Sequence, residues 1–213
     1  MFVGERMSHP VISITPDTPI HDAAVLLKKE HIRRAPVMQN GKLVGIISER
    51  DLLNASPSSV TSLSVWELNY LLSKVTVKQV MSKKVKTIDV NTPIEEAARI
   101  MADTKIGGLP VTRDGEVVGI ITETDLFKAF LEFMGARQKA LRVTAVIEDK
   151  PGQLAKITKA ISEAGGNFIS LGLFSGPDIT TNILTFKVSG MKKEAVKDVV
   201  IKSVKKIWDI RLC

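Results

Sequence analysis

The feature that most constrains the fold is an internal repeat. Moving the chain along itself by 74 positions aligns residues 7–53 with residues 81–127 without a gap. Of the 47 aligned positions, 20 are identical, and most of the other differences are conservative. Such self-similarity indicates one supersecondary unit used twice. Two copies packed together would bury the apolar face that each copy alone leaves exposed.

Each copy has the pattern of a strand, a helix, two strands and a second helix. In the first copy, an extended segment at 12–14 precedes a helix that starts beside Pro19 and has apolar residues at helical spacing. Residues 35–38 and 43–47 predict two strands joined by an Asn-Gly turn. The second of these strands is apolar throughout, which predicts burial on both faces. The second copy has Asp-Gly at the equivalent turn.

Between the copies, serine-rich residues 55–64 predict a loop and residues 65–73 predict a helix whose aromatic residues are packing residues. After the repeats, residues 141–212 predict the order βαββαβ, a ferredoxin-like plan. The sequence therefore predicts a mixed α+β and α/β protein. Its expected domains are repeat 1 at 1–60, repeat 2 with its leading helix at 61–134, and a further domain at 135–213.

Charge and composition exclude several classes of protein. The chain is 44% hydrophobic and 25% charged, which is typical of a globular protein and not of a disordered or coiled-coil one. Its net charge of +7 lies in residues 128–213, with 15 basic and 8 acidic side chains. Many of these surround one predicted helix: Lys192, Lys193, Lys197, Lys202, Lys205 and Lys206. No arginine or aromatic residue interleaves with them, so a solvated face is favoured over a nucleic-acid surface.

The only cysteine is Cys213, which excludes internal disulfides and thiolate metal clusters. No apolar run approaches the length of a membrane-spanning helix, and the N-terminus lacks the pattern of a signal peptide. We therefore expect a cytoplasmic protein with no membrane partner.

The motifs Ser48-x-x-Asp51 and Thr122-x-x-Asp125 occupy equivalent positions in the two copies. Each has the spacing of a capping box at a helix start, which needs no ligand. Alternatively, each aspartate could accept both hydroxyl protons of a ribose, while the hydroxyl and the first helical amides bind a phosphate. Recurrence at one place in both copies favours ligand binding.

Segments 45–51 (GIISERD) and 119–125 (GIITETD) resemble the G-h-x-[S/T]-x-x-D motif of cystathionine-beta-synthase (CBS) domains, and the resemblance extends over residues 1–133. It implies a CBS pair, or Bateman module, that binds an adenosine ligand such as AMP, ADP, ATP or S-adenosylmethionine. The aspartate would hold the ribose. Adenine would lie between the first strand of a copy, entered at Ser13 or Thr87, and the segment that precedes Pro36 or Pro110. The implied positions are Ser13, Arg33, Arg34, Ala35, Pro36, Ser48, Arg50, Asp51, Thr87, Gly107, Gly108, Leu109, Pro110, Thr122, Thr124 and Asp125.

The two implied sites differ in charge. Three arginines, Arg33, Arg34 and Arg50, make the first site cationic and suited to a di- or triphosphate. The second copy has Gly107, Gly108 and Thr124 at these positions, which predicts a roomy and almost uncharged site. That site could prefer AMP, or a shared site could draw arginines from the first copy.

The C-terminal segment VIEDKPGQLAKITKAISEAGGNFISL resembles the ACT domain, a small regulatory module that often binds amino acids. The resemblance implies ligand contacts at Asp149, Gly152 and Asn167 and side-by-side pairing of subunits. Without a ligand, Pro151-Gly152 would form a turn and Asn167 would follow a helix cap. A CBS pair followed by an ACT domain resembles the acetoin-utilisation accessory (AcuB-like) family.

An enzyme and a DNA-binding regulator are the competing functions. The three histidines lack metal-ligand spacing, and no Walker lysine or GxGxxG is present, so we expect no catalytic residues, no metal and no required cofactor. A DNA-binding or scaffold regulator would depend on the lysine-rich helix. We favour a regulatory homodimer in which an adenine nucleotide controls an unidentified enzyme. The signal would pass through the segment Leu126–Arg142, expected to be helical. An amino acid at the ACT domain is a candidate second ligand, and whether it binds is left open by the sequence.

Overall fold

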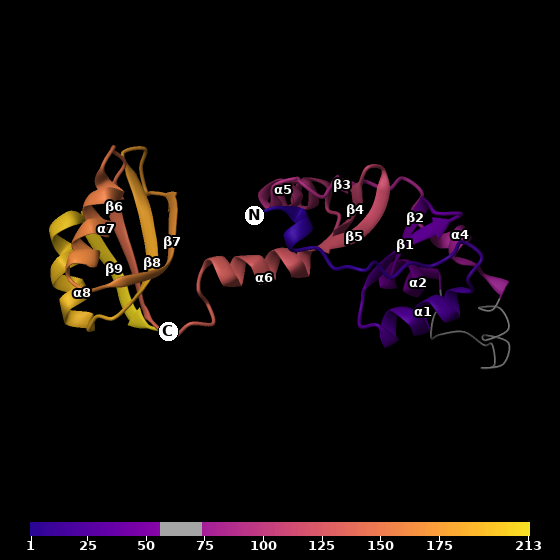
Figure 1. Ribbon diagram of the computed structural model, residues 1–213, viewed down its shortest axis with the longest axis horizontal. Coiled ribbons are helices and arrows are strands. Elements are labelled where there is room, and N and C mark those ends of the chain that lie inside the picture. Colours follow the sequence, from indigo (N-terminus) through magenta and orange to yellow (C-terminus); the bar gives the residue numbers. More distant parts are fainter. Residues whose placement is uncertain (56–73) are drawn as a thin grey trace. The chain divides into compact units, whose positions relative to one another are not determined.

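The computed structural model describes residues 1–55 and 74–213 (Figure 1). Residue contacts divide the chain into two compact units, Met1–Leu126 and Phe127–Cys213. The loop predicted for 55–64, apart from its first residue, and the helix predicted for 65–73 lie outside the described residues. In the described parts, no helix combines the length and the apolar character that crossing a bilayer requires.

The first repeat contains α1 (Ile20–Lys29), β1 (Arg34–Gln39), β2 (Lys42–Ser48) and α2 (Glu49–Ala55). The two strands form an antiparallel hairpin. The strand predicted for 12–14 is reduced to a single parallel bridge from Ile14 to Val37. The prediction that the second hairpin strand is buried on both faces was wrong. Only Gly45 and Ile47 are buried in β2, because this two-stranded hairpin is packed against the repeat core on one face.

The second repeat has the same order. It contains β3 (Ile88–Asp89), α5 (Ile94–Thr104), β4 (Gly108–Arg113), β5 (Glu116–Thr122) and α6 (Glu123–Phe133). The short β3 is parallel to β4, which forms an antiparallel hairpin with β5. Both predicted turns are confirmed by positive φ angles, 50° and 75° at Asn40-Gly41 and 50° and 85° at Asp114-Gly115.

The two repeats exchange their leading segments. The short helix η1 (Val3–Glu5) precedes the first repeat, yet Val3 is fully buried in the core of the second. The short helix α4 (Val77–Val80) precedes the second repeat, yet Val77 is fully buried in the core of the first. Backbone pairing supports both placements: Ser8 bridges to Ile120, and Ser82 to Ile46. Each repeat therefore completes the core of the other.

Glycine in each motif makes room for the exchanged segment. A Cβ on Gly119 would lie 2.5 Å from Sδ of Met7, and a Cβ on Gly45 would collide with Sδ of Met81. Both glycines are buried. The first residue of each motif is thus explained by the close approach of a methionine from the opposite leading segment.

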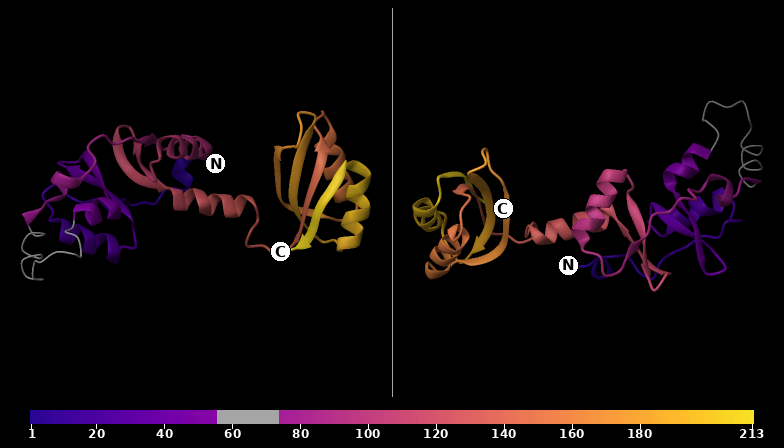
Figure 2. Two further views of the ribbon diagram at one scale, coloured as in Figure 1. Left: turned by 180° about the vertical axis from the view of Figure 1, so that it is seen from behind. Right: turned by 90° about the horizontal axis from the view of Figure 1, so that it is seen from above.

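The C-terminal unit has the predicted order βαββαβ. Its elements are β6 (Leu141–Glu148), α7 (Gln153–Glu163), β7 (Asn167–Ser175), β8 (Thr181–Ser189), α8 (Lys193–Val200), the short helix η2 (Ile201–Ser203) and β9 (Lys206–Leu212). The antiparallel sheet has the strand order β7-β8-β6-β9. Both α-helices cover one face (Figure 2). Between them and the sheet lies a core that includes Ile157, Ile161, Phe186, Val196 and Val200.

The segment between the repeats and the sheet differs from its prediction. The prediction of a helix over Leu126–Arg142 was wrong, because α6 ends at Phe133 and β6 begins at Leu141. A helix end at 135–138 and a strand from Leu141 were also predicted, and these agree with the structure. We call residues 134–140 the connector. Gly135 in the connector has a positive φ of 59°, which a continuing helix does not allow.

Candidate functional site

The motif of the first repeat forms a capping box at the start of α2. Oδ2 of Asp51 accepts hydrogen bonds from the backbone amide of Ser48 at 2.8 Å and from its hydroxyl at 2.6 Å. In return, the amide of Asp51 donates to the Ser48 hydroxyl at 3.3 Å. The capping reading of this motif is therefore confirmed.

The second motif repeats the arrangement at the start of α6. Oδ2 of Asp125 accepts from the amide of Thr122 at 2.9 Å and from its hydroxyl at 2.7 Å. Asp125 is 7% exposed. In both motifs the hydrogen bonds that the aspartate carboxylate accepts end on one of its oxygens, Oδ2. A carboxylate has two oxygens and about four acceptor positions, so capping is compatible with accepting further hydrogen bonds from a ligand.

The residues assigned to adenine binding lie beside these motifs. Across the hairpins, Arg34 pairs with Ser48 and Gly108 pairs with Thr122. The amide of Ile14 donates to the carbonyl of Pro36, which brings Ser13 to the same end of the first hairpin. The pairing of Ile88 with Val111 likewise brings Thr87 beside Pro110. Each repeat therefore gathers its entry residue, its strand proline and its motif at one place.

These positions differ in burial. Five are exposed: Ser13, Arg33, Arg50, Thr87 and Thr124. Five are half-buried: Arg34, Ser48, Asp51, Gly107 and Thr122. The buried ones are Ala35, Pro36, Gly108, Leu109, Pro110 and Asp125. The polar groups are thus mostly within reach of a ligand, while the prolines and their neighbours form the base.

Arg34 reaches from the first repeat to the second. A Cβ on Gly107 would lie 2.6 Å from Nη1 of Arg34 and 2.8 Å from Oε2 of Glu123. A Cβ on Gly108 would lie 2.8 Å from Cδ of Arg34. The guanidinium therefore lies in the volume that side chains at 107 and 108 would occupy. The second site was predicted to be roomy, but Arg34 fills this part of it, as the shared-site alternative allowed.

Burial is the main cause that lowers the pKa of the Arg34 guanidinium. The negative charge of Glu123 opposes this change, the charge of Arg33 adds to it, and the charge of Asp51 opposes it. Acidic groups of both motifs thus favour the charged form of Arg34. Sequence reasoning missed Glu123, although its identity with Glu49 in the aligned copies was a signal.

A family model described as CBS domain matches the chain twice, over residues 3–58 and 77–132. Together the matches cover more than half of the sequence. The chain belongs to the CBS-domain family. Its two repeats are therefore the CBS domains of a tandem pair, and the motifs at Asp51 and Asp125 lie within the two matches.

Three solved structures resemble the chain over more than half of its length. The CBS domain pair of protein MJ0100, in complex with 5′-methylthioadenosine and S-adenosyl-L-methionine, is 29% identical with a TM-score of 0.52, over 65% of this chain and 98% of that one. CBSX2 in complex with AMP is 32% identical with a TM-score of 0.51, over 61% and 96%. A Vibrio cholerae protein described as an acetoin utilization protein (AcuB) is 28% identical with a TM-score of 0.53, over 64% and 95%.

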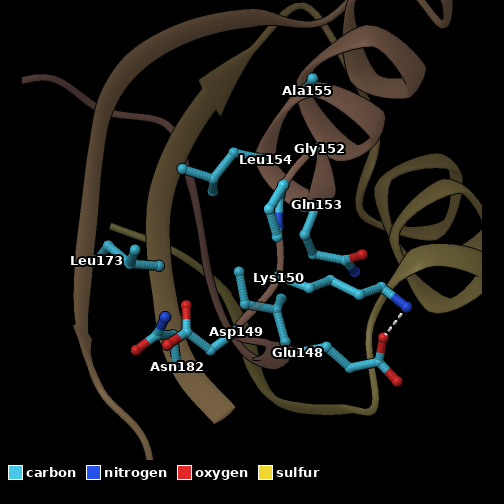
Figure 3. A pocket seen from close by; sticks show the side chains of 11 residues that line it. Glu148, Asp149, Lys150, Gly152, Gln153, Leu154, Ala155, Leu173 and Asn182 are labelled. Carbon is cyan, nitrogen blue, oxygen red and sulfur yellow. Dashed lines mark ion pairs between the residues drawn. The ribbon is translucent and has the colours of Figure 1, made fainter. Parts of the chain in front are cut away.

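The C-terminal unit lies beyond the CBS matches and contains a hollow of about 440 Å³ (Figure 3). Its floor is apolar, with Ile147, Leu154 and Leu173, and its rim is polar. Gly152, at the N-cap of α7, has a φ of 80° and places the turn at this rim. Lys150 forms an ion pair with Glu148, and hydrogen bonding from this ammonium lowers the pKa of the Glu148 carboxyl.

Of the positions that the ACT resemblance assigns, Asp149 and Gly152 line this hollow. Asn167 does not, because it pairs with Ser189 at the opposite end of the β7–β8 ladder from Asn182. Asn182 lines this hollow together with Asp149 (Figure 3). Sequence reasoning missed Asn182, since it lies on a strand far along the chain and only the pairing of β6 with β8 brings it near.

A second hollow of about 430 Å³ is lined by Asp149 and Asn182, which it shares with the first hollow, and by residues of the β7–β8 loop. Asp178 fixes this loop by accepting from the amide and hydroxyl of Thr180 at 2.8 and 2.6 Å, and these bonds lower the pKa of its carboxyl. Among the described residues, no group of three or more histidine, cysteine, aspartate or glutamate side chains is placed to hold a metal ion.

Proposed function

We propose that this chain is a non-catalytic regulatory protein that senses an adenosine ligand with its CBS pair. The observation that carries the proposal is the carboxylate–hydroxyl pair at the start of α2 and again at the start of α6. Its candidate ligands are AMP, ADP, ATP and S-adenosylmethionine. The adenosine ligands of the MJ0100 and CBSX2 structures support this class of ligand.

The chemistry of the site agrees with such a ligand. A half-buried or buried aspartate is an acceptor that can take hydrogen bonds from the two hydroxyls of a ribose. The adjacent Ser48 or Thr122 is a hydroxyl within reach of a phosphate. Arg33 and Arg50 are exposed near the first motif and would pair with the phosphates of a nucleotide.

The C-terminal unit is proposed to be an ACT domain that binds an amino acid in the hollow beside Asp149. Its βαββαβ order and sheet order support the domain type. The carboxylate of Asp149 would receive the ammonium group, and the apolar floor at Leu154 and Leu173 would receive the side chain. Asn167 would then act outside this hollow.

A homodimer and a regulated enzyme complete the proposal. Apolar side chains on α6 are exposed at Phe127, Phe130 and Phe133, and Leu53 on α2 is 73% exposed at the position equivalent to Phe127. Exposed apolar groups of this kind favour contact with another protein. The resemblance to the Vibrio cholerae protein, described as an acetoin utilization protein, supports the proposal that the regulated enzyme acts in acetoin utilisation.

A DNA-binding or scaffold regulator is the alternative. The observation in its favour is that the six lysines at 192–206 named above are all exposed. Binding to duplex DNA that falls by orders of magnitude between about 50 and 200 mM salt would favour this alternative.

Thermal unfolding of the full chain with added ligands tests the proposal. AMP, ATP or S-adenosylmethionine at about 100 times its dissociation constant should stabilise the protein by about 3 kcal/mol and raise Tm by several degrees. Inosine monophosphate at equal concentration controls for adenine recognition. The twenty amino acids test the hollow, with Asp149→Asn as the disabled variant and Asp198→Asn, exposed on α8, as its control. No shift with any adenosine ligand at millimolar concentration would contradict the sensor.

A further inference from the structure

The two adenosine sites are made unequal by one side chain. Positions 33 and 34 of the first CBS domain are arginines, and the aligned positions 107 and 108 of the second are glycines. The guanidinium of Arg34 lies against both glycines, in the volume that a Cβ at either position would need. The second domain has no side chain at these positions that could enter the first site in return.

This guanidinium lies at the residues that precede Pro110, which is the segment assigned to adenine. Nη1 of Arg34 and Oε2 of Glu123 both approach the Cβ position of Gly107, at 2.6 and 2.8 Å. Glu123 follows Thr122 directly in the second motif. An adenine ring that entered beside Gly107 would therefore meet a charged group from each CBS domain.

The groups around Arg34 act in opposite directions on the charge of its guanidinium. Burial and the neighbouring Arg33 oppose the charged guanidinium, whereas Glu123 of the second motif and Asp51 of the first motif favour it. Arg34 therefore has an acidic neighbour in each CBS domain. The guanidinium can thus turn from Glu123 toward Asp51 and keep an acidic neighbour.

We propose that Arg34 is the residue that determines which site fills: it blocks the second adenosine site, and ligand enters the first site in preference. The proposal rests on the proposed adenosine binding. In the unliganded chain the second site is closed by a residue of the first domain. It opens only when the guanidinium leaves Gly107 and Gly108, for example toward Asp51.

Calorimetric titration of the full chain with AMP and with 5′-methylthioadenosine tests the proposal. The second probe has no phosphate, so it separates blocking by Arg34 from attraction by its charge. Wild type should bind one equivalent tightly and a second at least about tenfold more weakly. Arg34→Ala should bind the second equivalent at least about tenfold more tightly than wild type, with one or both probes.

Arg113→Ala is the control, because Arg113 is an exposed arginine at the other end of β4 from Gly108; it should leave both binding events unchanged. Arg34→Met retains the apolar stem and replaces Arg34→Ala if alanine prevents folding. If the affinity for the second equivalent is unchanged in the Arg34 variants, or is weaker with both probes, the blocking role alone would be overturned. Failure of every protein, wild type included, to bind either probe would overturn adenosine sensing and the blocking role together.

Discussion

Lys187 and Gly135 are joined by a hydrogen bond of 3.0 Å from Nζ to the carbonyl oxygen, although one lies within the C-terminal sheet and the other in the connector. The same ammonium donates to the carbonyls of Gln138 at 2.9 Å and Cys213 at 3.5 Å. Lys187 is 5% exposed, so three backbone carbonyls take the place of water around its charge. The connector and the end of β9 are thereby fixed to the sheet.

Replacing Lys187 with methionine should destabilise the C-terminal unit by about 1–3 kcal/mol, because connector carbonyls lose their donor. Urea unfolding followed by circular dichroism measures this change. Lys159→Met is the control: Lys159 lies on α7 with a 76% exposed side chain, and the substitution should change stability by less than about 0.5 kcal/mol. Equal effects of the two substitutions would show that the hydrogen bonds of Lys187 to the connector do not stabilise the C-terminal unit.

Replacing Val3 with alanine should destabilise the CBS pair by about 1–3 kcal/mol, since Val3 is fully buried in the core of the second domain. Val25→Ala on α1 removes the same atoms from a side chain that is 53% exposed and should cost almost nothing. Thermal unfolding of both variants tests the exchanged leading segment. A Val3 variant as stable as the Val25 variant would place residues 1–8 outside the core.

Gly119→Ala should destabilise the pair more than Gly45→Ala. The added Cβ at 119 meets the backbone carbonyl of Ser8 at 2.9 Å as well as Met7, and backbone cannot move as a side-chain end can. At 45 the close contact is with the flexible end of Met81, and the Ser82 carbonyl is 3.2 Å away. Denaturation midpoints give the order of the two variants, and the reverse order would contradict the packing described here.

Local patterns predicted much of this fold from the sequence. The Asn-Gly and Asp-Gly turns each need two residues with positive φ, and they fixed both hairpins of the pair. The S/T-x-x-D spacing predicted the capping bonds, because N-cap and N3 are always neighbours in a helix. Alternation along 141–147 predicted β6 for the same kind of local reason.

Contacts between distant segments could not be read in this way. The placement of Val3 in the second domain and of Val77 in the first depends on how two similar domains pack. Arg34 reaches Gly107 because two hairpin ends meet, which no spacing within one copy encodes. The ACT resemblance assigned Asn167 and Asp149 to ligand contacts, yet Asn167 lies at the opposite end of the β7–β8 ladder from the hollow that Asp149 lines.

The most direct test of adenosine sensing is calorimetric titration of AMP into wild type, Asp51→Asn, Asp125→Asn and Asp114→Asn. Asparagine retains an oxygen for the helix cap but loses the carboxylate that a ribose needs, so folding is preserved. Asp114→Asn is the control, in an exposed turn of the same domain. We predict AMP binding by wild type and by the control, and a loss of at least about tenfold in affinity at one site in Asp51→Asn or Asp125→Asn. Unchanged affinity in both motif variants, or no binding by wild type at millimolar AMP, would contradict the account and leave the motifs as helix caps alone.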